Sequence, residues 1–148
     1  MVLRIRQGRV SILFTGDIEA PAESALLQSG VPLETTVLKV PHHGSRSSIL
    51  PRFLARTCPQ TAVISVGRAN PFGHPSPEAL EAYGIIGSRV LRTDRDGAVG
   101  VETDGDTIRY SSYRDTVLLP ASFKNGLWAV EWGNLKKSGR AWWGFRPA

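Results

Sequence analysis

Hydrophobic and polar positions along residues 1–110 follow the pattern of an α/β protein. Several apolar segments have the length of strands, and the first two alternate over part of their length, which is typical of strands with one buried face. The segment at 61–66 is almost entirely apolar, as expected for a strand buried on both faces. Strands are predicted at residues 2–6, 9–14, 36–40, 61–66, 89–93, 98–103 and 107–110, the first two as a hairpin and the last three as a meander.

Helices are predicted between these strands, because proline and capping residues stand where helices begin and end. Pro21 is placed as a first-turn proline, and Ser29 and Gly30 follow as a C-terminal cap. Ser76 and Pro77 are placed as an N-cap and a first helical residue. Helices are therefore predicted at residues 21–28, 49–57 and 77–83.

The composition indicates one globular domain. The chain has 148 residues, of which 41% are hydrophobic and 21% charged. No apolar run approaches the roughly 18 to 20 residues of a membrane span, and the first residues lack the apolar region of a signal peptide, so an isolated chain is expected in the cytoplasm. The single cysteine, Cys58, excludes a disulfide framework and a cysteine-rich zinc module. Any metal must then be bound by His, Asp or Glu.

Charge and aromatic residues divide the chain into two parts. Most of the net charge of +5 comes from residues 111–148, which also hold all four tryptophans. We expect a domain at 1–110 and a Trp-rich basic tail at 111–148 that packs on the domain or stays loose, the alternative being a stacking surface for single-stranded nucleic acid. Residues 39–77 contain Lys and Arg but no Asp or Glu, which indicates an anionic partner unless the arginines only aid solubility.

Acidic and imidazole side chains follow three of the predicted strands. The candidate metal ligands are Asp17, His42, His43 and His74. Because functional groups gather beyond the carboxyl ends of strands in open α/β sheets, we expect these side chains to converge. Imidazole nitrogen and carboxylate oxygen suit Zn, Mn or Fe, whereas the alternative is that each histidine is a hydrogen-bonded loop residue. The acidic clusters at 94–97 and 104–106 are interpreted as turn chemistry rather than as calcium ligands.

The same loops supply groups that could bind phosphate oxygens. They are Lys39, Ser45, Arg46, Ser47, Ser48, Arg68 and Asn70. With a metal that activates water and cations that stabilise charge on phosphorus, hydrolysis of a phosphodiester fits these groups better than hydrolysis of a neutral amide. A simple anion-binding loop would carry the same groups. Cys58 and Ser65 are poor candidates for a nucleophile, because neither lies in a nucleophile motif.

Four segments of the sequence together resemble a known family. They are Phe-Thr-Gly-Asp-Ile at 14–18, Val-Leu-Lys-Val-Pro-His-His-Gly-Ser-Arg at 37–46, Ile-Ser-Val-Gly at 64–67 with Asn-Pro-Phe-Gly-His-Pro at 70–75, and Arg-Thr-Asp-Arg-Asp-Gly at 92–97. This set resembles the metallo-β-lactamase-fold domain at the C-terminus of ComEC-type DNA-uptake (competence) proteins. The resemblance implies a metal-dependent nuclease attached to a polytopic membrane channel. Asp17 matches the metal-bridging aspartate, and His42, His43 and His74 match positions that contact metal or substrate.

The resemblance covers only the second half of that domain, because the first-half motif His-x-His-x-Asp-His does not occur in this sequence. The implied fold is the C-terminal half of an αββα sandwich, a mixed sheet with helices on one face. One sheet face is then expected to be exposed, and to drive formation of a homodimer or binding of the missing N-terminal half-domain or membrane channel portion. In a full-length protein the domain is expected at the outer face of the bacterial inner membrane.

The leading hypothesis is therefore one half of a metal-dependent nuclease that acts on DNA during transformation, with Mn or Zn as cofactor and two ions in the complete domain. The expected catalytic residues are Asp17, Lys39 and His43, and the expected phosphate contacts are Lys39, Ser45, Arg46 and Asn70. One alternative is a catalytically inert remnant that at most binds nucleic acid. Another is a small-molecule hydrolase of the same fold, since a fold does not determine a substrate.

Overall fold

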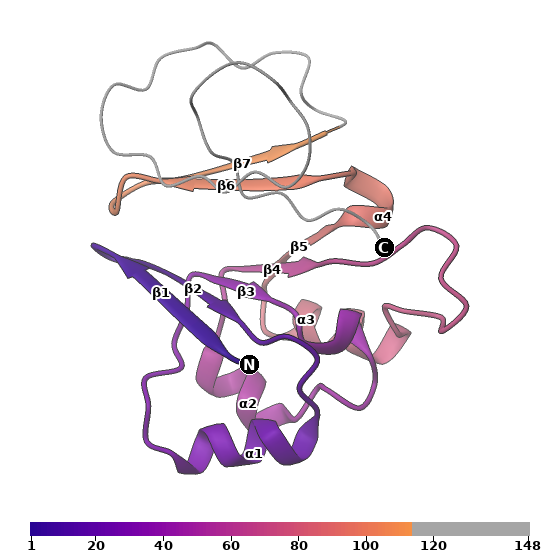
Figure 1. The fold of residues 1–148 in the computed structure, drawn as a ribbon, viewed down its shortest axis with the longest axis horizontal. Helices are drawn as coiled ribbons and strands as arrows, with labels where there is room; N and C mark the ends of the chain where they lie inside the picture. Colours follow the sequence, from indigo (N-terminus) through magenta and orange to yellow (C-terminus); the bar gives the residue numbers. More distant parts are fainter. Residues whose placement is uncertain (114–148) are drawn as a thin grey trace.

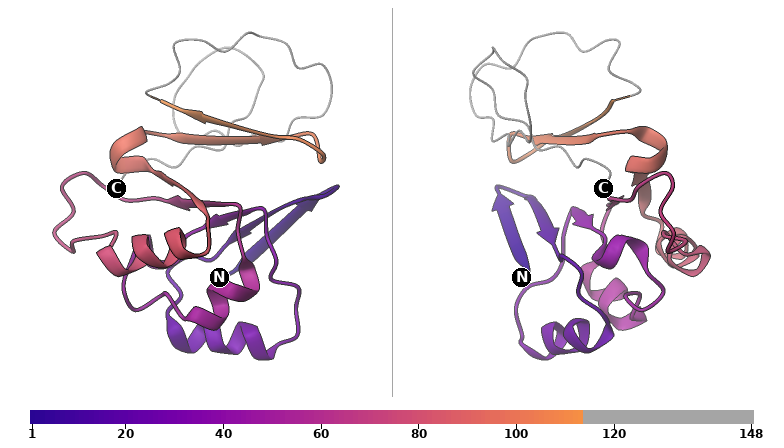
Figure 2. Two further views of the ribbon diagram at one scale, coloured as in Figure 1. Left: turned by 180° about the vertical axis from the view of Figure 1, so that it is seen from behind. Right: turned by 45° about the vertical axis from the view of Figure 1, so that its right-hand side comes forward.

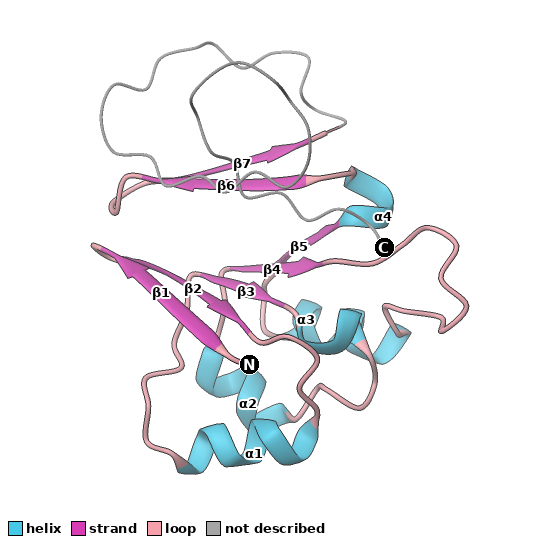
Figure 3. Ribbon diagram, viewed as in Figure 1, coloured by secondary structure: helices cyan, strands magenta, loops and turns pink. Residues whose placement is uncertain are grey.

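The computed structural model describes residues 1–113, which form a five-stranded sheet with helices packed on one face and a two-stranded sheet over the other (Figure 1). Of the Trp-rich tail predicted at 111–148, residues 114–148 lie outside the described residues, and residues 111 and 112 belong to the last strand. The strands are β1 (Leu3–Gln7), β2 (Val10–Phe14), β3 (Val37–Lys39), β4 (Thr61–Ile64), β5 (Arg89–Arg92), β6 (Val99–Thr103) and β7 (Ile108–Ser112). The helices are α1 (Ala20–Gln28), the 3₁₀ turn η1 (Pro41–Gly44), α2 (Pro51–Thr57), α3 (Pro77–Ile85) and α4 (Thr93–Asp96), and Figure 3 distinguishes them from the loops.

The larger sheet is mixed, with the strand order β1-β2-β3-β4-β5. β1 and β2 form the predicted antiparallel hairpin, in which Ile5 lies opposite Ile12. β2, β3, β4 and β5 are parallel to one another. The predicted mixed α/β fold is confirmed at this level. Because β2, β3 and β4 run in the same direction, the loops that follow them leave the sheet at the same edge.

The predicted meander is wrong for its first strand. β5 belongs to the large sheet, where Val90 lies opposite Ala62 of β4, and only β6 and β7 form an antiparallel pair. A parallel pair requires a crossover connection, and α3 supplies it between β4 and β5. The short helix α4 then directs the chain to the second sheet, as two further views show (Figure 2). Residues 93–96 are thus helical instead of a simple turn.

The acidic residues near these elements accept local hydrogen bonds, as the turn interpretation requires. The Asp104 carboxylate accepts bonds from the backbone N–H groups of Asp106 and Thr107 and from the Thr107 hydroxyl, and these bonds lower its pKa to about 2. A carboxylate oxygen of Asp96 accepts the backbone N–H of Arg92 at 2.7 Å. Turn and cap chemistry therefore accounts for both acidic clusters.

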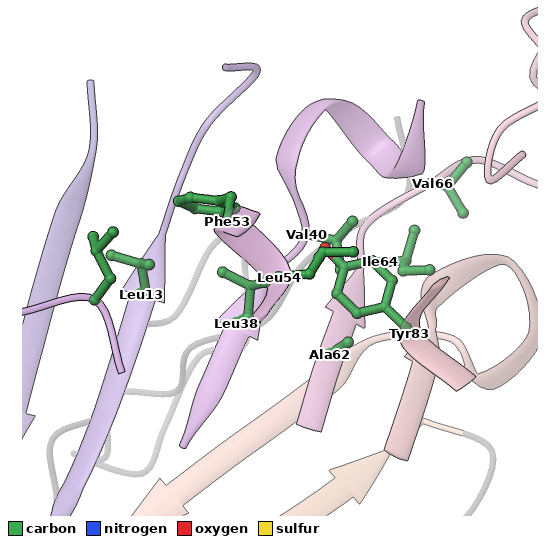
Figure 4. Close-up of a cluster of buried hydrophobic side chains, with 10 residues drawn as sticks. Leu13, Leu38, Val40, Phe53, Leu54, Ala62, Ile64, Val66 and Tyr83 are labelled. Carbon is green, nitrogen blue, oxygen red and sulfur yellow. The ribbon is translucent and has the colours of Figure 1, made fainter. Parts of the chain in front are cut away.

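The main core lies between the large sheet and the three helices α1, α2 and α3. Leu38 and Ile64 from the central strands are fully buried, as are Phe53 of α2 and Tyr83 of α3. Figure 4 shows several of these side chains gathered against the helices. Burial of one such side chain contributes roughly 1.5 to 3 kcal/mol, so this layer holds in place the strand ends from which the three loops emerge.

The opposite sheet face is only partly covered, by the β6–β7 hairpin. Val37 and Val63 of the large sheet pack with Val99 of β6 in a second buried cluster. At β1 the cover is thinner, because Leu3 and Ile5 remain 45% and 39% exposed. The expectation of a fully open sheet face is therefore too simple: the centre is closed by the hairpin, and the exposed apolar part lies at the β1 edge.

The ends of the helices follow the capping signals with small shifts. Ser76 is the N-cap of α3, and its hydroxyl accepts the backbone N–H of Ala79 at 3.1 Å. The second helix begins at Pro51 instead of residue 49, because Leu50 is extended and Pro51 takes a first-turn position. Within residues 1–113, no helix is long and apolar enough to cross a membrane.

A carboxyl group is buried between these helices. Glu23 of α1 is fully buried, and its Oε2 accepts the backbone N–H of Leu50 at 3.0 Å. Among residues 1–113, its Oε1 and the hydroxyl of buried Tyr83 have no hydrogen-bond partner. Burial raises the pKa of the Glu23 carboxyl, although the bond from Leu50 opposes the shift. Burial and the nearby Glu23 charge also raise the pKa of Tyr83.

Glu23→Gln should stabilise the protein at neutral pH. Because the pKa of Glu23 is raised in the folded state, the protonated carboxyl stabilises the fold. This stabilisation is complete below the ordinary pKa of 4.5, and it is lost as the pH rises through the folded-state pKa. Glutamine keeps an acceptor for Leu50 and carries no charge. Denaturant unfolding at pH 4 should give similar free energies for the two proteins, and at pH 7 the variant should be the more stable. The same difference at both pH values would contradict the account.

Candidate metal and phosphate site

Two hydrogen bonds connect the loops that follow β2 and β3. The hydroxyl of Thr15 donates to the carbonyl of Lys39 at 2.7 Å, and the backbone N–H of His42 donates to the carbonyl of Gly16 at 3.1 Å. Both bonds lie at the carboxyl edge of the parallel strands. Asp17, which follows Gly16, is thereby held beside the two histidines.

The loop after β4 is joined to the same place through Gly44. The backbone N–H of Ser76 donates to the carbonyl of Gly44 at 2.9 Å. Gly44 has a φ of +81°, and a Cβ at this position would lie 2.7 Å from the Cβ of Pro75. The absence of a side chain lets the two loops touch. As a result, the ring of His74 lies 5.7 Å from the ring of His42.

His42 and His43 have an unusual backbone. Their φ values are +42° and +56°, in the left-handed region that residues with a Cβ seldom adopt. Each such residue costs about 1 to 3 kcal/mol, and such strain clusters at functional sites when the surroundings hold it in place. The segment Pro41–Gly44 is thus a single 3₁₀ turn with a kink at both histidines.

His43 has its imidazole oriented by a hydrogen bond. Nδ1 donates to the carbonyl of Ser65 at 2.6 Å, because a carbonyl can only accept. Nε2 therefore carries the lone pair of the neutral ring, and it lies 3.6 Å from Oδ1 of Asp17. A backbone carbonyl on one ring nitrogen is the arrangement that orients metal-binding histidines through the other.

Lys39 lies beneath the same carboxylate. Its side chain is buried, with Nζ 3.8 Å from Oδ1 of Asp17 and 3.4 Å from the carbonyl of Gly16, to which it donates. Burial lowers the pKa of the Lys39 ammonium, and the charge of Asp17 offsets part of that shift. A buried cation beside an exposed carboxylate supplies fixed positive charge at the base of the site.

His42 contacts a residue that the sequence did not indicate. Its Nδ1 lies 3.0 Å from Oε1 of Glu19, although the direction is not that of a hydrogen bond. The same oxygen of Glu19 accepts the hydroxyl of Ser47 at 3.1 Å. Glu19 stands two residues after Asp17 in the same loop, and that spacing is the signal that could have identified it.

His74 completes the group of imidazoles. Burial lowers the pKa of its ring, and the charges of His42, His43 and Arg46 lower it further. The ring also stacks with Phe72, with centroids 6.0 Å apart and an angle of 22° between the planes. The three histidines and Asp17 thus come together as the strand order predicts.

Two of the expected phosphate contacts make hydrogen bonds within their own loops. The Asn70 amide donates to the carbonyls of Gly67 and His74, and its oxygen accepts the backbone N–H of His74. The Ser45 hydroxyl lies 3.0 Å from that of Ser47. These side chains hold the loops in shape. Arg46 is exposed, and Arg68 donates to the carbonyl of Asp94 from an exposed position.

The structure gives the two poor nucleophile candidates no catalytic role through their side chains. Cys58 is the left-handed C-cap of α2, an element at the other end of the strands. Ser65 takes part through its backbone carbonyl, which accepts the bond from His43. Within the part of the chain that the structure describes, neither side chain has a hydrogen bond or ion pair that would activate it as a nucleophile.

The described residues fit a divalent metal only in part. Two atoms bound to one ion at about 2.1 Å lie roughly 3.0 to 3.4 Å apart, close to the 3.6 Å between Nε2 of His43 and Oδ1 of Asp17. Imidazole nitrogen and carboxylate oxygen are also suitable donors for Zn or Mn. Among residues 1–113, however, no three His, Cys, Asp or Glu side chains are arranged to hold one ion. The pair would need further ligands.

Fold and site together define an α/β protein with a loop-built cluster of imidazoles, a carboxylate and cations at the carboxyl edge of its sheet. The chain is 36% identical over 99 residues to ComE operon protein 3 of Bacillus subtilis, and 37% identical over 99 residues to Competence protein ComA of Neisseria gonorrhoeae. It is 33% identical over 113 residues to Recombination protein 2 of Haemophilus influenzae. These matches cover 67%, 66% and 76% of this chain.

The chain spans 13% to 14% of the length of these three relatives. No family model matches the chain, and no solved structure matches it significantly. The similarity relates this chain to one segment of competence-related proteins.

Gly44→Ala should lower the free energy of unfolding more than Gly73→Ala. Both glycines have positive φ, +81° and +69°, so both variants bear the cost of a left-handed alanine, about 1 to 2 kcal/mol. Only at Gly44 would the new Cβ meet Pro75, whereas nothing lies within 4 Å at Gly73. Overpacking should add roughly 1 to 3 kcal/mol. Equal losses in denaturant unfolding would show that the loop contact at Pro75 is not tight.

Proposed function

We propose that this chain is the C-terminal half of a metallo-β-lactamase-fold nuclease domain, which hydrolyses DNA with Mn or Zn during DNA uptake in transformation. The observation that carries the proposal is the pair formed by Asp17 and His43. The imidazole nitrogen that the Ser65 bond leaves free faces the carboxylate at 3.6 Å. The similarity to a protein named for competence supports the part of the proposal that concerns DNA uptake.

Asp17 and His43 would hold the metal, with His42 and His74 beside them as further ligands or substrate contacts. A bound divalent ion lowers the pKa of water and offsets charge on phosphate oxygens. The Ser65 carbonyl contributes by keeping the His43 proton on Nδ1, so that Nε2 stays available as a donor.

Lys39 and Arg46 would supply positive charge to the phosphate. The phosphate oxygens gain negative charge as the bond to phosphorus forms, and cations already in position stabilise that charge. The Lys39 ammonium lies 3.8 Å from Oδ1 of Asp17, and the charge of Arg46 contributes to lowering the pKa of His74. Ser45 and Asn70 stay predicted phosphate contacts, and either would give up part of its loop hydrogen bonding to reach the substrate.

The remaining ligands would come from the missing N-terminal half-domain. An Asp-His pair supplies fewer protein ligands than the three that catalytic zinc sites use. The relatives are several times longer than this chain and have room for such a segment. In a full-length protein with a membrane channel portion, the domain would lie at the outer face of the inner membrane. When the N-terminal half-domain is not bound, the exposed apolar side chains of β1 would favour a homodimer.

The alternative is an inert, nucleic-acid-binding remnant. Within the described residues, no three potential ligands are arranged around one point. A remnant of this kind would bind DNA with a steep dependence on salt and with no dependence on metal. A nuclease half would bind Mn or Zn weakly through Asp17 and histidine, and calorimetric titration of each metal separates the two.

Asp17→Ala should abolish metal-dependent cleavage of single-stranded DNA in the complete domain, reconstituted from this chain and the preceding half. Loss of the carboxylate that holds the metal should reduce the rate by at least about a hundredfold, to the level seen with a chelator. DNA affinity should stay within about twofold, because the phosphate-binding cations are unchanged. The measurement is Mn-dependent cleavage of a labelled oligonucleotide.

Asp106→Ala is the matched control. Asp106 is an exposed aspartate in the β6–β7 turn, where it pairs with exposed Arg9 at 3.1 Å. Its removal changes the net charge equally and should leave cleavage unchanged. Full activity of the Asp17→Ala protein, or equal losses in both variants, would overturn the assignment of Asp17.

A further inference from the structure

Phe72 exposes a large aromatic ring next to the candidate site. It is 77% exposed and lies in the loop between β4 and α3. Single exposed hydrophobic residues are common on protein surfaces, so exposure alone says little. The position of Phe72 is more informative, because its ring stacks on His74 at 6.0 Å and 22°.

The stacked pair continues into the site through ring contacts. His74 lies 5.7 Å from His42, and His42 lies 6.3 Å from His43, which faces Asp17. A series of ring contacts therefore connects Phe72 with His43, which faces the carboxylate. The loop itself is held by the three hydrogen bonds of Asn70, two of them to the backbone of His74.

We propose that Phe72, supported by His74, is a stacking platform for a nucleobase of single-stranded DNA. This inference rests on the proposed function, and it assigns to Phe72 the base that lies beside the phosphate. Every base has a π face, so an aromatic ring binds bases of any sequence. The strand must be single, because a base inside a duplex already stacks on its neighbours.

The charges around the platform suit the phosphates on either side of such a base. Arg46 is close enough to lower the pKa of His74, and Arg68 stands in the same loop as Phe72. Residues 39–77 contain no Asp or Glu, although the carboxylates of Asp17 and Glu19 lie near this segment, against His43 and His42. Exposed aromatic rings combined with positive charge bind single strands in a sequence-tolerant manner.

The first test compares two labelled oligonucleotides of equal length, one of normal thymidine residues and one of abasic residues, by fluorescence anisotropy without metal. Phe72→Ala should bind the normal strand roughly 5- to 10-fold more weakly, and the abasic strand within about twofold of the unaltered chain. Phe72→Trp should restore binding, and Phe72→Leu should not, because leucine is apolar but has no π face.

Ile85→Ala is the matched control for loss of an exposed apolar side chain. Ile85 is 78% exposed at the end of α3, where the chain turns back to the start of β5 and so lies at the opposite end of the sheet from the site. Its removal should leave both affinities unchanged. If Phe72→Ala lowers the affinity for the normal and the abasic oligonucleotide equally, or lowers neither, the stacking role is overturned. DNA binding by the chain would not be affected by that result. No binding of either strand by the unaltered chain would overturn the proposed function as well.

A second test locates the base directly. Oligonucleotides that carry 5-iodouracil crosslink under light to aromatic side chains that contact the base, and mass spectrometry identifies the peptide. We expect a crosslink to the peptide that contains Phe72 and His74. Crosslinks confined to the tryptophans of the tail would show that the base is bound elsewhere on the chain.

Discussion

The 2.6 Å hydrogen bond from Nδ1 of His43 to the Ser65 carbonyl joins the turn after β3 to the end of β4, and the arrangement of the site depends on it. It fixes the imidazole so that Nε2 faces Asp17. It also helps to offset the left-handed backbone at His42 and His43, which by itself costs several kcal/mol in total. Without that bond, the ring of His43 would be free to turn away, and one of the hydrogen bonds that hold the strained turn would be lost.

The bond is possible only because the sheet is parallel at this point. The parallel pairing of β3 with β4 places the carboxyl ends of both strands side by side. The helices pack against one face of these strands and hold them in position. Gly44 then allows the third loop to approach, since any side chain there would meet Pro75. Strain, packing and hydrogen bonding therefore act on the same few residues. A preorganised binding site requires a rigid scaffold of this kind, which tolerates the backbone strain at His42 and His43.

Local patterns in the sequence were sufficient to predict the strands, the helices α1, α2 and α3, and the convergence of Asp17 with the three histidines. Those features follow from periodicity, proline placement and strand direction. The pairing of β5 with β4 was not predicted, because it depends on the crossover by α3 and not on the turn at 94–97. The contact of Glu19 with His42 and the loop-holding bonds of Asn70 depend on where distant backbone atoms lie. A single sequence shows which residue types a loop offers, as the spacing of Asp17 and Glu19 does, but not which of them come into contact.

The central claim is that Asp17 and His43 are paired in order to bind a divalent cation. The most direct measurement is paramagnetic broadening of backbone NMR signals on addition of Mn²⁺ to the isotopically labelled chain. The account predicts selective broadening at the three loops, residues 15–19, 41–46 and 65–75, at low metal concentration. Broadening confined to the acidic segments at 94–96 and 104–106, or no selective broadening, would contradict it.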